Sequence, residues 1–596
     1  MSWRKRVIAN IAVKVERNLG SCSNWSALYG LRHMAHARTI NLPPTASFIG
    51  TWEKHITTPL FRLENLKLTN SCIQPIPGTK GKSTATMSGT GKVGDNLSLN
   101  DETNQPLSPL PPPPLQAQNY TANSVKMVIS ELRVQRGIAL PMMAMNLAWF
   151  AKTAITTAFL GRLGELSLAG GALGFTFANV TGFSVLNGIC GAMEPICGQA
   201  HGAKNFRLLH KTLLMTIILL LLVSLPITFL WLNVDKIFIH FGQQQDISIV
   251  AGTYASFLIP DLFVASLFCP LKAYLSSQSI TLPTMFSSAV ALAFHIPVNI
   301  VLSKTMGLRG VAMAVWITDL IVVVLLAIYV LIIENKKGSM WKEGGWWDQS
   351  VEDWIRLVKL CGSCCLNTCL EWWCYEILVL LTGHLTNAKQ AVGVLAIVLN
   401  FDYLLFSVML SLATCVSTRV SNELGANQAA LAYRSAYVSL TLGFISGCIG
   451  SLLMVAARGI WGPLFSHDRG IIKGVSKTML LMAVVEVFNF PLAVCGGIVR
   501  GTARPWLGAY ANLGGFYFLA LPLGIVFAFK LRLGLVGLFI GLLVGIVTCL
   551  TLLLVFIARL NWVEEAAKAQ TLTSNEQVKE LPKYDAEKRI DAREKV

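Results

Sequence analysis

The sequence Cys369-Leu370-Glu371-Trp372-Trp373-Cys374-Tyr375-Glu376 lies in the middle of an apolar run from about Ile355 to Thr382. An ionisable side chain at bilayer depth costs about 3 kcal/mol or more, so it normally faces a protein interior or a water-filled cavity. Glu371 and Glu376 are therefore candidates for an ion or substrate path, and the alternative is a structural hydrogen bond to a neighbouring helix. On an ideal helix the two carboxylates point roughly 140° apart, so we do not expect one paired acid site.

The composition around this stretch is that of a polytopic membrane protein. Hydrophobic residues make up 53% of the 596 residues, charged residues 14%, and the mean hydropathy is +0.56. A soluble protein would need a very large core to bury this surface. The net charge of +17 comes from the N-terminal region and from loops that flank apolar spans. We expect membrane lipids, and no nucleic acid, as the partner of these charges.

Five regions follow from changes in composition along the chain. Residues 1–124 are basic and of low complexity, and we expect them to be disordered. Two glycine-containing stretches in this tail, near residues 81–83 and 89–94, imitate nucleotide-binding motifs but lack the strand that such motifs follow. The remaining regions are an N-terminal lobe (125–333), a cytoplasmic linker (334–353), a C-terminal lobe (354–560) and a charged cytoplasmic tail (561–596).

Twelve apolar segments are each long enough to cross about 30 Å as a helix. The predicted fold class is therefore an all-α polytopic membrane protein. The predicted spans are 138–160, 168–190, 208–232, 248–270, 280–302, 311–333, 355–382, 391–415, 434–457, 474–498, 507–529 and 535–558.

The twelve segments resemble two copies of six. Gly161-Arg162-Leu163 and Gly202-Ala203-Lys204-Asn205 in the first half correspond to Gly383-His384-Leu385 and Gly425-Ala426-Asn427-Gln428 in the second. Pro283 corresponds to Pro505 at an offset of 222 residues (505 − 283). Because six is even, the halves share one orientation, and a pseudo-twofold axis along the membrane normal with a central cleft is expected.

Basic residues indicate the orientation weakly. They precede the first span and recur after the second and the sixth, which favours both termini in the cytoplasm. The membrane itself is left open between plasma membrane, vacuolar membrane and other endomembranes. The basic residues after these two spans are Lys204, Arg207, Lys211, Lys336, Lys337 and Lys342.

Several motifs resemble those of the multidrug and toxic compound extrusion (MATE) family, and within it the plant detoxification efflux carriers. They extend over residues 126–560, about three quarters of the chain, and are highly specific when taken together. The matching stretches are Phe159-Leu160-Gly161-Arg162-Leu163-Gly164, Met193-Glu194-Pro195-Ile196-Cys197-Gly198-Gln199-Ala200, Glu371-Trp372-Trp373-Cys374-Tyr375-Glu376, Ser417-Thr418-Arg419-Val420-Ser421-Asn422-Glu423-Leu424-Gly425-Ala426-Asn427 and Arg500-Gly501-Thr502-Ala503-Arg504-Pro505.

The resemblance implies two six-helix lobes in a V and export of organic solutes, commonly cationic, against entry of protons or sodium. It implies a transporter without enzymatic activity, cofactor or metal, whose coupling ion is a proton or sodium, and which works as a monomer. The family's acidic residues of the seventh and tenth helices match Glu371, Glu376 and Glu486. The aspartate that some members carry in the first helix is not matched, since Asn146 stands there, so we expect no coupling site in the first lobe.

Further acids lie inside the predicted spans. Glu486 precedes Asn489 and Pro491, and a proline inside a helix frees a backbone carbonyl, which adds polar groups to the site. We expect Glu371 and Glu486 to share one cavity, where desolvation favours the neutral form of a carboxyl group. Asp402 is a further candidate, with a bond to a nearby hydroxyl as the alternative. Structural pairing is expected for Asp261 and Asp319, while His295 and Lys152 have no assigned role.

Aromatic and charged residues near the turns complete the set of candidates. Trp372, Trp373 and Tyr375 offer aromatic faces for cation–π contact with a cationic solute, although such residues more often pack in a core. Gate or hinge roles are expected for four residues beside glycine-rich turns, with salt bridges from the acids to the nearby bases Lys204 and Arg419. These four are Glu194, Pro195, Arg419 and Glu423.

Three functions compete with proton-coupled antiport. A membrane receptor or scaffold could keep the transporter fold while the basic tail signals, but the retained acids argue against it. A sodium-coupled carrier would use the same acids. A transporter of lipid-linked precursors requires a strongly basic cavity, whereas the acids predict an acidic one. A primary pump is excluded because the sequence has no nucleotide site.

Overall fold

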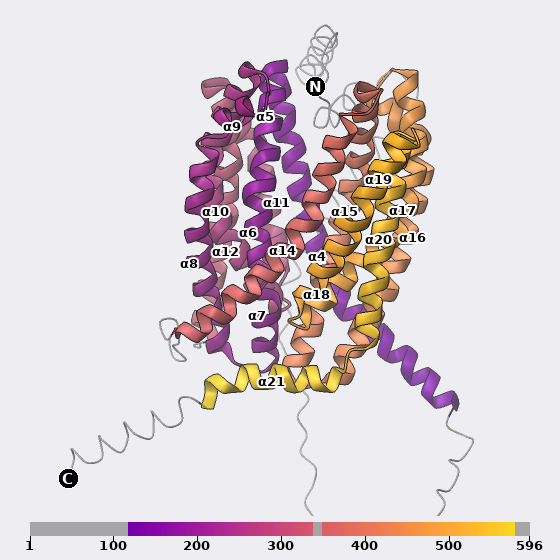
Figure 1. The fold of residues 1–596 in the computed structure, drawn as a ribbon. Helices are drawn as coiled ribbons and strands as arrows, with labels where there is room; N and C mark the ends of the chain where they lie inside the picture. The colour runs from indigo at the N-terminus through magenta and orange to yellow at the C-terminus, as the bar shows by residue number, and fades with distance from the viewer. Residues whose placement is uncertain (1–116, 338–348, 579–596) are drawn as a thin grey trace, which may run out of the picture. The chain divides into compact units, whose positions relative to one another are not determined.

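Helices make up the regular structure of the residues that the computed structural model describes, 117–337 and 349–578, with side chains over 126–333 and 349–573 (Figure 1). Within these ranges there is no β-strand, and residues from Ser124 onward belong to one compact unit. The predicted all-α fold class is confirmed.

The first half contains α4 (Ala117–Arg162), α5 (Glu165–Ala178), the π-helix η1 (Asn179–Phe183), α6 (Ser184–Cys190), α7 (Met193–Gly202), α8 (Phe206–Trp231), α9 (Val234–His240), α10 (Gln245–Ser277), α11 (Leu282–Met306) and α12 (Leu308–Lys337). The second half contains α14 (Val351–Thr382), α15 (Ala388–Gly425), α16 (Ala429–Phe465), α17 (Arg469–Gly501), α18 (Pro505–Asn512), η2 (Leu513–Ala520), α19 (Leu521–Ile525), η3 (Val526–Lys530), α20 (Leu535–Ala558) and α21 (Trp562–Val578).

Twelve helical segments of the described chain are long and apolar enough to cross a membrane, as the sequence predicts. Ten of the predicted spans lie within one of them, while 208–232 ends one residue after its helix and 280–302 begins two residues before its helix. The second and eleventh contain π-helical turns, at η1 in the second and at η2 and η3 in the eleventh. The chain is therefore a multi-pass integral membrane protein.

Two terminal segments differ from the prediction. The helix α4 begins at Ala117, inside the segment predicted to be disordered, whose first 116 residues lie outside the described part. The predicted C-terminal tail begins with α21, which lies across one end of the bundle, here called the base (Figure 1). It buries Trp562, Ala566 and Ala569, and small side chains let it pack closely against the bundle.

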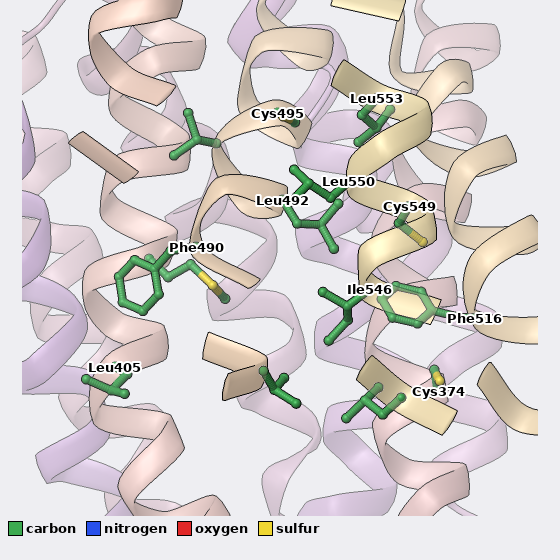
Figure 2. Close-up of a cluster of buried hydrophobic side chains, with 14 of the residues drawn as sticks. Cys374, Leu405, Phe490, Leu492, Cys495, Phe516, Ile546, Cys549, Leu550 and Leu553 are labelled. Carbon is green, nitrogen blue, oxygen red and sulfur yellow. The ribbon is translucent and has the colours of Figure 1, made fainter. Parts of the chain in front are cut away.

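Each half has its own hydrophobic core, and that of the second half includes Phe490, Phe516 and Ile546 (Figure 2). The first turns of α14 belong to the other core, however, because Leu357 and Cys361 pack among residues of the first half. Serine 350 begins this helix with a capping box, since its hydroxyl accepts from the Asp353 amide and the Asp353 carboxylate accepts from the Ser350 amide. Helix α14 thus starts in one lobe and ends in the other.

Helix α4 makes the reciprocal crossing. In the first part of its apolar span, Gln135 donates to the carbonyl of Ser435 and Asn146 donates to Ser411 Oγ at 2.9 Å. The helix therefore packs on the second half between these two residues. Its last turns belong to the core of the first half. Pro141 lies between, and the Gly137 carbonyl that it frees accepts a hydrogen bond from Thr281 at 3.3 Å.

Each crossing helix carries an acid that pairs with a base of the opposite half. Glu131 on α4 binds Arg419 of the second half, and Asp353 on α14 binds Lys211 of the first half at 2.6 Å. The two acids are separated by 222 residues (353 − 131), the same offset that relates Pro283 to Pro505. The repeat therefore relates the two acids but not their bases, which are 208 residues apart (419 − 211).

The lobes meet at the base through the glycines that end α7 and α15. A Cβ at Gly202 would clash with the backbone of Asn422, and a Cβ at Gly425 would clash with the backbone of Gln199. Because backbone rather than flexible side chain limits the space, these positions permit only glycine in the closed contact.

We expect Gly425→Val to prevent closure of the base and to lower transport more than tenfold, since the valine methyl groups cannot fit against α7. Chemical cross-linking across the base and solute transport measure the two effects. Gly459→Val on α16 is the matched control, because a Cβ there meets no atom within 4 Å. Closure with wild-type yield in Gly425→Val would contradict this account.

Candidate functional site: acids in the second lobe

Two carboxyl groups meet inside the second lobe. Glu486 on α17 is fully buried, and Asp402 on α15 is 8% exposed. Their side chains lie close enough to share a hydrogen bond when one of them carries a proton. The Asn489 amide donates to Glu486 Oε1 at 3.3 Å from one turn further along α17. The sequence named each of these residues as a candidate, and the structure brings them together.

This contact requires a proton. Glu486 Oε2 is buried and has no hydrogen-bond donor within the described part of the chain. Two ionised carboxylates in contact would repel each other in a medium that solvates neither. A proton held between Asp402 and Glu486 removes one charge and supplies the missing donor, as in other paired carboxyl groups.

Tyr375 on α14 lies within electrostatic range of this pair and of Glu371. Its hydroxyl lies in the electrostatic field of Asp402, Glu486 and Glu371. Glu371 itself forms no hydrogen bond or ion pair with the described residues and interacts electrostatically with Arg500. The neighbour of Glu486 is Asp402, and a cavity shared by Glu371 and Glu486 stays a prediction.

Glu376 has a different neighbour. It interacts with Tyr403 on α15, whose hydroxyl also lies in the field of Asp402. Glu371 and Glu376 thus face different tyrosines, in agreement with the angle between them predicted from the helix geometry.

A small cavity reaches the same tyrosine. It has a volume of about 20 Å³ and is lined by Tyr375, Thr382 and apolar side chains of α15, α17 and α20. This is enough for one water molecule, which needs about 10–15 Å³ and polar partners. Tyr375 therefore borders a mostly apolar space between α14, α15, α17 and α20.

The two tryptophans have structural contacts. Trp372 packs edge-to-face against Phe406, with ring centroids 6.3 Å apart. The Trp373 indole donates to the carbonyl of Val180 at 3.2 Å, in the π-helix η1 of the first lobe. Trp373 nevertheless remains 40% exposed, so a face of its ring is accessible.

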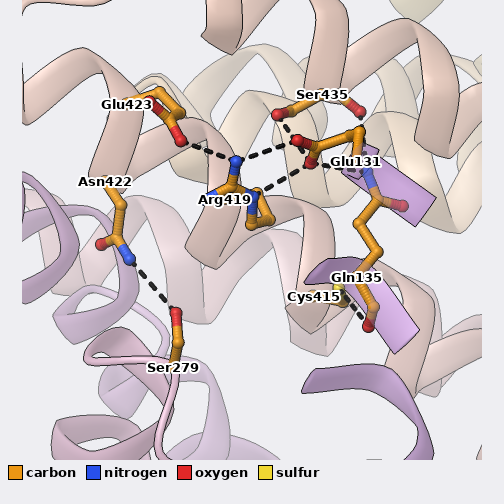
Figure 3. A network of polar contacts seen from close by, with 8 residues as sticks. All are labelled: Glu131, Gln135, Ser279, Cys415, Arg419, Asn422, Glu423 and Ser435. Atoms are coloured by element: carbon orange, nitrogen blue, oxygen red, sulfur yellow. Dashed lines mark hydrogen bonds and ion pairs between the residues drawn. The ribbon is translucent and has the colours of Figure 1, made fainter. Parts of the chain in front are cut away.

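Charged residues at the base form two groups. Arg419 binds Glu131 through two nitrogens, at 3.0 and 2.9 Å, and Glu423 at 2.6 Å (Figure 3). Glu194 binds Arg500 at 3.2 Å, whereas the sequence had suggested Lys204 as its partner. That suggestion was wrong because the nearest base along the chain is not the nearest in the fold. Pro195 is buried on α7 beside this ion pair.

Substitution of Arg419 by Gln should lower the free energy of unfolding by about 3–5 kcal/mol. It leaves the carboxylates of Glu131 and Glu423, both mostly buried, without their cation. Arg419→Lys keeps the charge but loses the two-nitrogen contact, and we expect an intermediate effect. Thermal unfolding in detergent measures the three proteins, and equal midpoints for wild type and Arg419→Gln would contradict the assignment.

A second polar cluster lies in the first lobe. Lys152 on α4 pairs with Asp319 on α12, and both interact electrostatically with the buried Asp261 on α10. The ring of His295 contacts the hydroxyls of Thr156 and Thr318 at 2.9 and 3.0 Å. The predicted structural pairing is observed for Asp319.

Sequence reasoning gave no role to Lys152, His295 or Arg500. Lys152 and Arg500 are the cations next to the acids of the two lobes. The signal available was the position of Lys152 inside an apolar span, where a charge needs a counterion. The position of Arg500 near a span end concealed its role, because arginines are common there.

Comparisons with known proteins identify the family. The MatE family model matches residues 141–301 and 363–526. Protein DETOXIFICATION 56 of Arabidopsis thaliana is 64% identical over 449 residues, which cover 75% of this chain and 91% of that protein. Protein DETOXIFICATION 48 of the same plant is 40% identical over 456 residues, 76% of this chain and 85% of that protein.

Solved structures agree. The crystal structure of the eukaryotic MATE transporter AtDTX14 superposes with a TM-score of 0.70 at 31% identity, covering 75% of this chain and 99% of that one. A MATE structure in a bent conformation shares the fold, with a TM-score of 0.64 at 14% identity over 74% of this chain and 97% of that chain. The chain belongs to the multidrug and toxic compound extrusion (MATE) family of transporters and is of the plant detoxification efflux carrier type.

Proposed function

We propose that this transporter exports cationic or amphipathic organic solutes in exchange for protons, by alternating access. The observation that carries the proposal is the contact between Asp402 and Glu486, which needs a proton to exist in a buried site. Deprotonation leaves two adjacent negative charges, and a cation is the ligand that stabilises them.

Proton and substrate then exclude each other. The protonated pair carries one negative charge less and attracts a cation weakly, so proton entry releases the substrate. Tyr375, which lies within electrostatic range of the pair and of Glu371, supports the proposal because its hydroxyl can donate to either when the charges change. Glu371, with no bonded partner in the described chain, is available to contact the substrate directly.

We assign the base to the cytoplasm. Basic residues that line or adjoin it include Lys204, Arg207, Lys211, Arg356 and Lys359, as expected for the cytoplasmic ends of membrane helices. The ion pairs and glycine contacts at the base then seal the cytoplasmic side in this state, and the substrate leaves on the opposite side. Plasma membrane and vacuolar membrane both suit this orientation.

Uptake into proteoliposomes tests the function. Labelled cationic, neutral and anionic solutes of similar size are offered with and without a proton gradient, and a sodium gradient of equal size is the comparison. We expect gradient-dependent uptake of cations. Uptake driven only by the sodium gradient would mean that sodium, and not a proton, is the coupling ion. Solute binding without transport in a folded protein would favour the receptor alternative.

Glu371→Gln removes a carboxylate but not the proton-holding pair. We therefore expect weaker binding of cationic solutes with the pH dependence of transport retained, and Glu371→Asp should keep partial activity because it shortens the reach by one methylene group. The transport rate, measured against solute concentration at two pH values, separates an effect on substrate binding from an effect on pH dependence. Unchanged apparent affinity for every cationic solute would show that Glu371 does not contact the substrate.

A further inference from the structure

A pocket at the base is distinct from the acidic site. It has a volume of about 290 Å³, close to the lower end of small-molecule sites. Its walls come from both lobes and from the C-terminal helix, through Gln199 on α7, Lys211 on α8, Lys359 on α14, Trp506 on α18 and Thr573 on α21.

Cations outnumber acids in this pocket. Lys211, Arg356 and Lys359 line it, and Asp353 is the only acid among the described residues that line it. Lys211 is buried, and its ammonium group is bound by Asp353 at 2.6 Å, so one charge is neutralised within the wall. Arg356 and Lys359 are exposed and form no ion pair with another described residue, which leaves the lining residues with a net charge of two positive units.

The pocket lies where a lipid headgroup would reach it. Arg356 and Lys359 are in the first turns of α14, and Ile355 and Val358 between and beside them are 62% and 49% exposed. Cationic side chains thus alternate with apolar ones that contact lipid in a membrane-spanning helix. Apolar residues such as Leu208 and Met215 line the pocket behind the cations. Basic pockets between membrane helices on the cytoplasmic side bind anionic headgroups.

We propose that this pocket binds the phosphate headgroup of an anionic phospholipid from the cytoplasmic leaflet. Arg356 and Lys359 contact the phosphate, and the apolar wall accommodates the first part of the lipid. The proposal takes from the proposed function only the cytoplasmic orientation of the base, and its test does not depend on transport.

Lipid binding here would stabilise the closed base. The pocket exists only while α7 and α8 of the first lobe, α14 and α18 of the second, and α21 are together. Helix α21 is held there because Asn205 donates to the Thr573 carbonyl at 2.9 Å and Arg504 pairs with Glu565. A ligand that contacts these elements together favours the state that contains the pocket.

Titration of the purified full-length protein with phosphatidic acid, followed by native mass spectrometry, tests the proposal. We expect one saturable site in the wild type. In Arg356→Gln/Lys359→Gln the affinity should fall about thirtyfold, the effect of two cations near an anionic surface. Phosphatidylcholine should not occupy the site.

Two further variants define the site. Arg133→Gln/Arg136→Gln removes two exposed cations from α4 that are three residues apart, as Arg356 and Lys359 are. These two arginines lie outside the pocket, so this variant should bind phosphatidic acid like the wild type. Ser363→Trp keeps both pocket cations but fills the cavity and should lose binding. Size-exclusion profiles establish that each variant is folded.

Inorganic phosphate distinguishes a lipid from a soluble phosphate compound. In phosphatidylcholine nanodiscs, phosphatidic acid should raise the midpoint of thermal unfolding and inorganic phosphate should not. An equal rise with phosphate would overturn the lipid assignment in favour of a soluble ligand. Equal phosphatidic acid binding by wild type and the Arg356→Gln/Lys359→Gln variant, or no saturable site at all, would overturn the pocket as the site.

Discussion

Glu486→Gln should abolish proton-driven transport while the protein still folds and inserts. The glutamine amide donates a permanent hydrogen bond to Asp402 and so imitates the protonated pair, which can no longer release its proton. Coupling between two ligands is typically 5–150-fold, and the dependence of transport on pH should fall by this factor. Uptake into proteoliposomes across a range of pH measures it.

The pair should behave as one unit. Asp402→Asn is expected to have nearly the same effect as Glu486→Gln, and the double variant should be no worse than either, because each change already fixes the state of the pair. Asp468→Asn is the matched control, since it removes one exposed carboxylate from the cap of α17 while asparagine still caps the helix. Wild-type pH dependence in Glu486→Gln would place the coupling centre elsewhere.

Lys152→Met should destabilise the first lobe by about 3–5 kcal/mol, the cost of removing one partner of a buried ion pair. The change leaves Asp319 and the buried Asp261 without their cation. Thermal unfolding of the purified protein is the measurement.

Restoring the charge balance should rescue part of this loss. In the double variant Lys152→Met/Asp319→Asn, the neutral asparagine at position 319 needs no counterion. We therefore expect its midpoint of thermal unfolding to lie above that of Lys152→Met alone. Lys304→Met, an exposed lysine of the same lobe, should change the midpoint little. If Lys152→Met were as stable as Lys304→Met, the pair would contribute nothing to the fold.

The pattern of apolar residues along the chain was enough to predict the membrane-spanning helices, but not where all of the helices begin and end. Twelve apolar segments predicted twelve spans because each must satisfy its backbone inside the membrane. Helix α21 was not predicted, since its contact face consists of small residues such as Ala566 and Ala569 between charged ones. Helix α4 begins before its apolar span, and in that part of the helix Glu131 and Gln135 are held by polar contacts with the second half.

The candidate site was predicted residue by residue but not as an arrangement. A carboxylate in an apolar span is visible in the sequence, and so Glu371, Asp402 and Glu486 were all identified. That Asp402 contacts Glu486 depends on the packing of α15 against α17, which no periodicity specifies. The same limit produced the wrong partner for Glu194.

The crossing of α4 into the second lobe has a consequence for biosynthesis. Glu131 and Arg419 are 288 residues apart in the chain. At a synthesis rate of roughly 5–20 residues per second, the glutamate waits about 15–60 s for its counterion. The first helix to leave the ribosome therefore cannot complete its contacts until the eighth is made. Final assembly of both lobes is postponed to a late step of insertion, and a truncated chain would expose an unpaired acid to quality control.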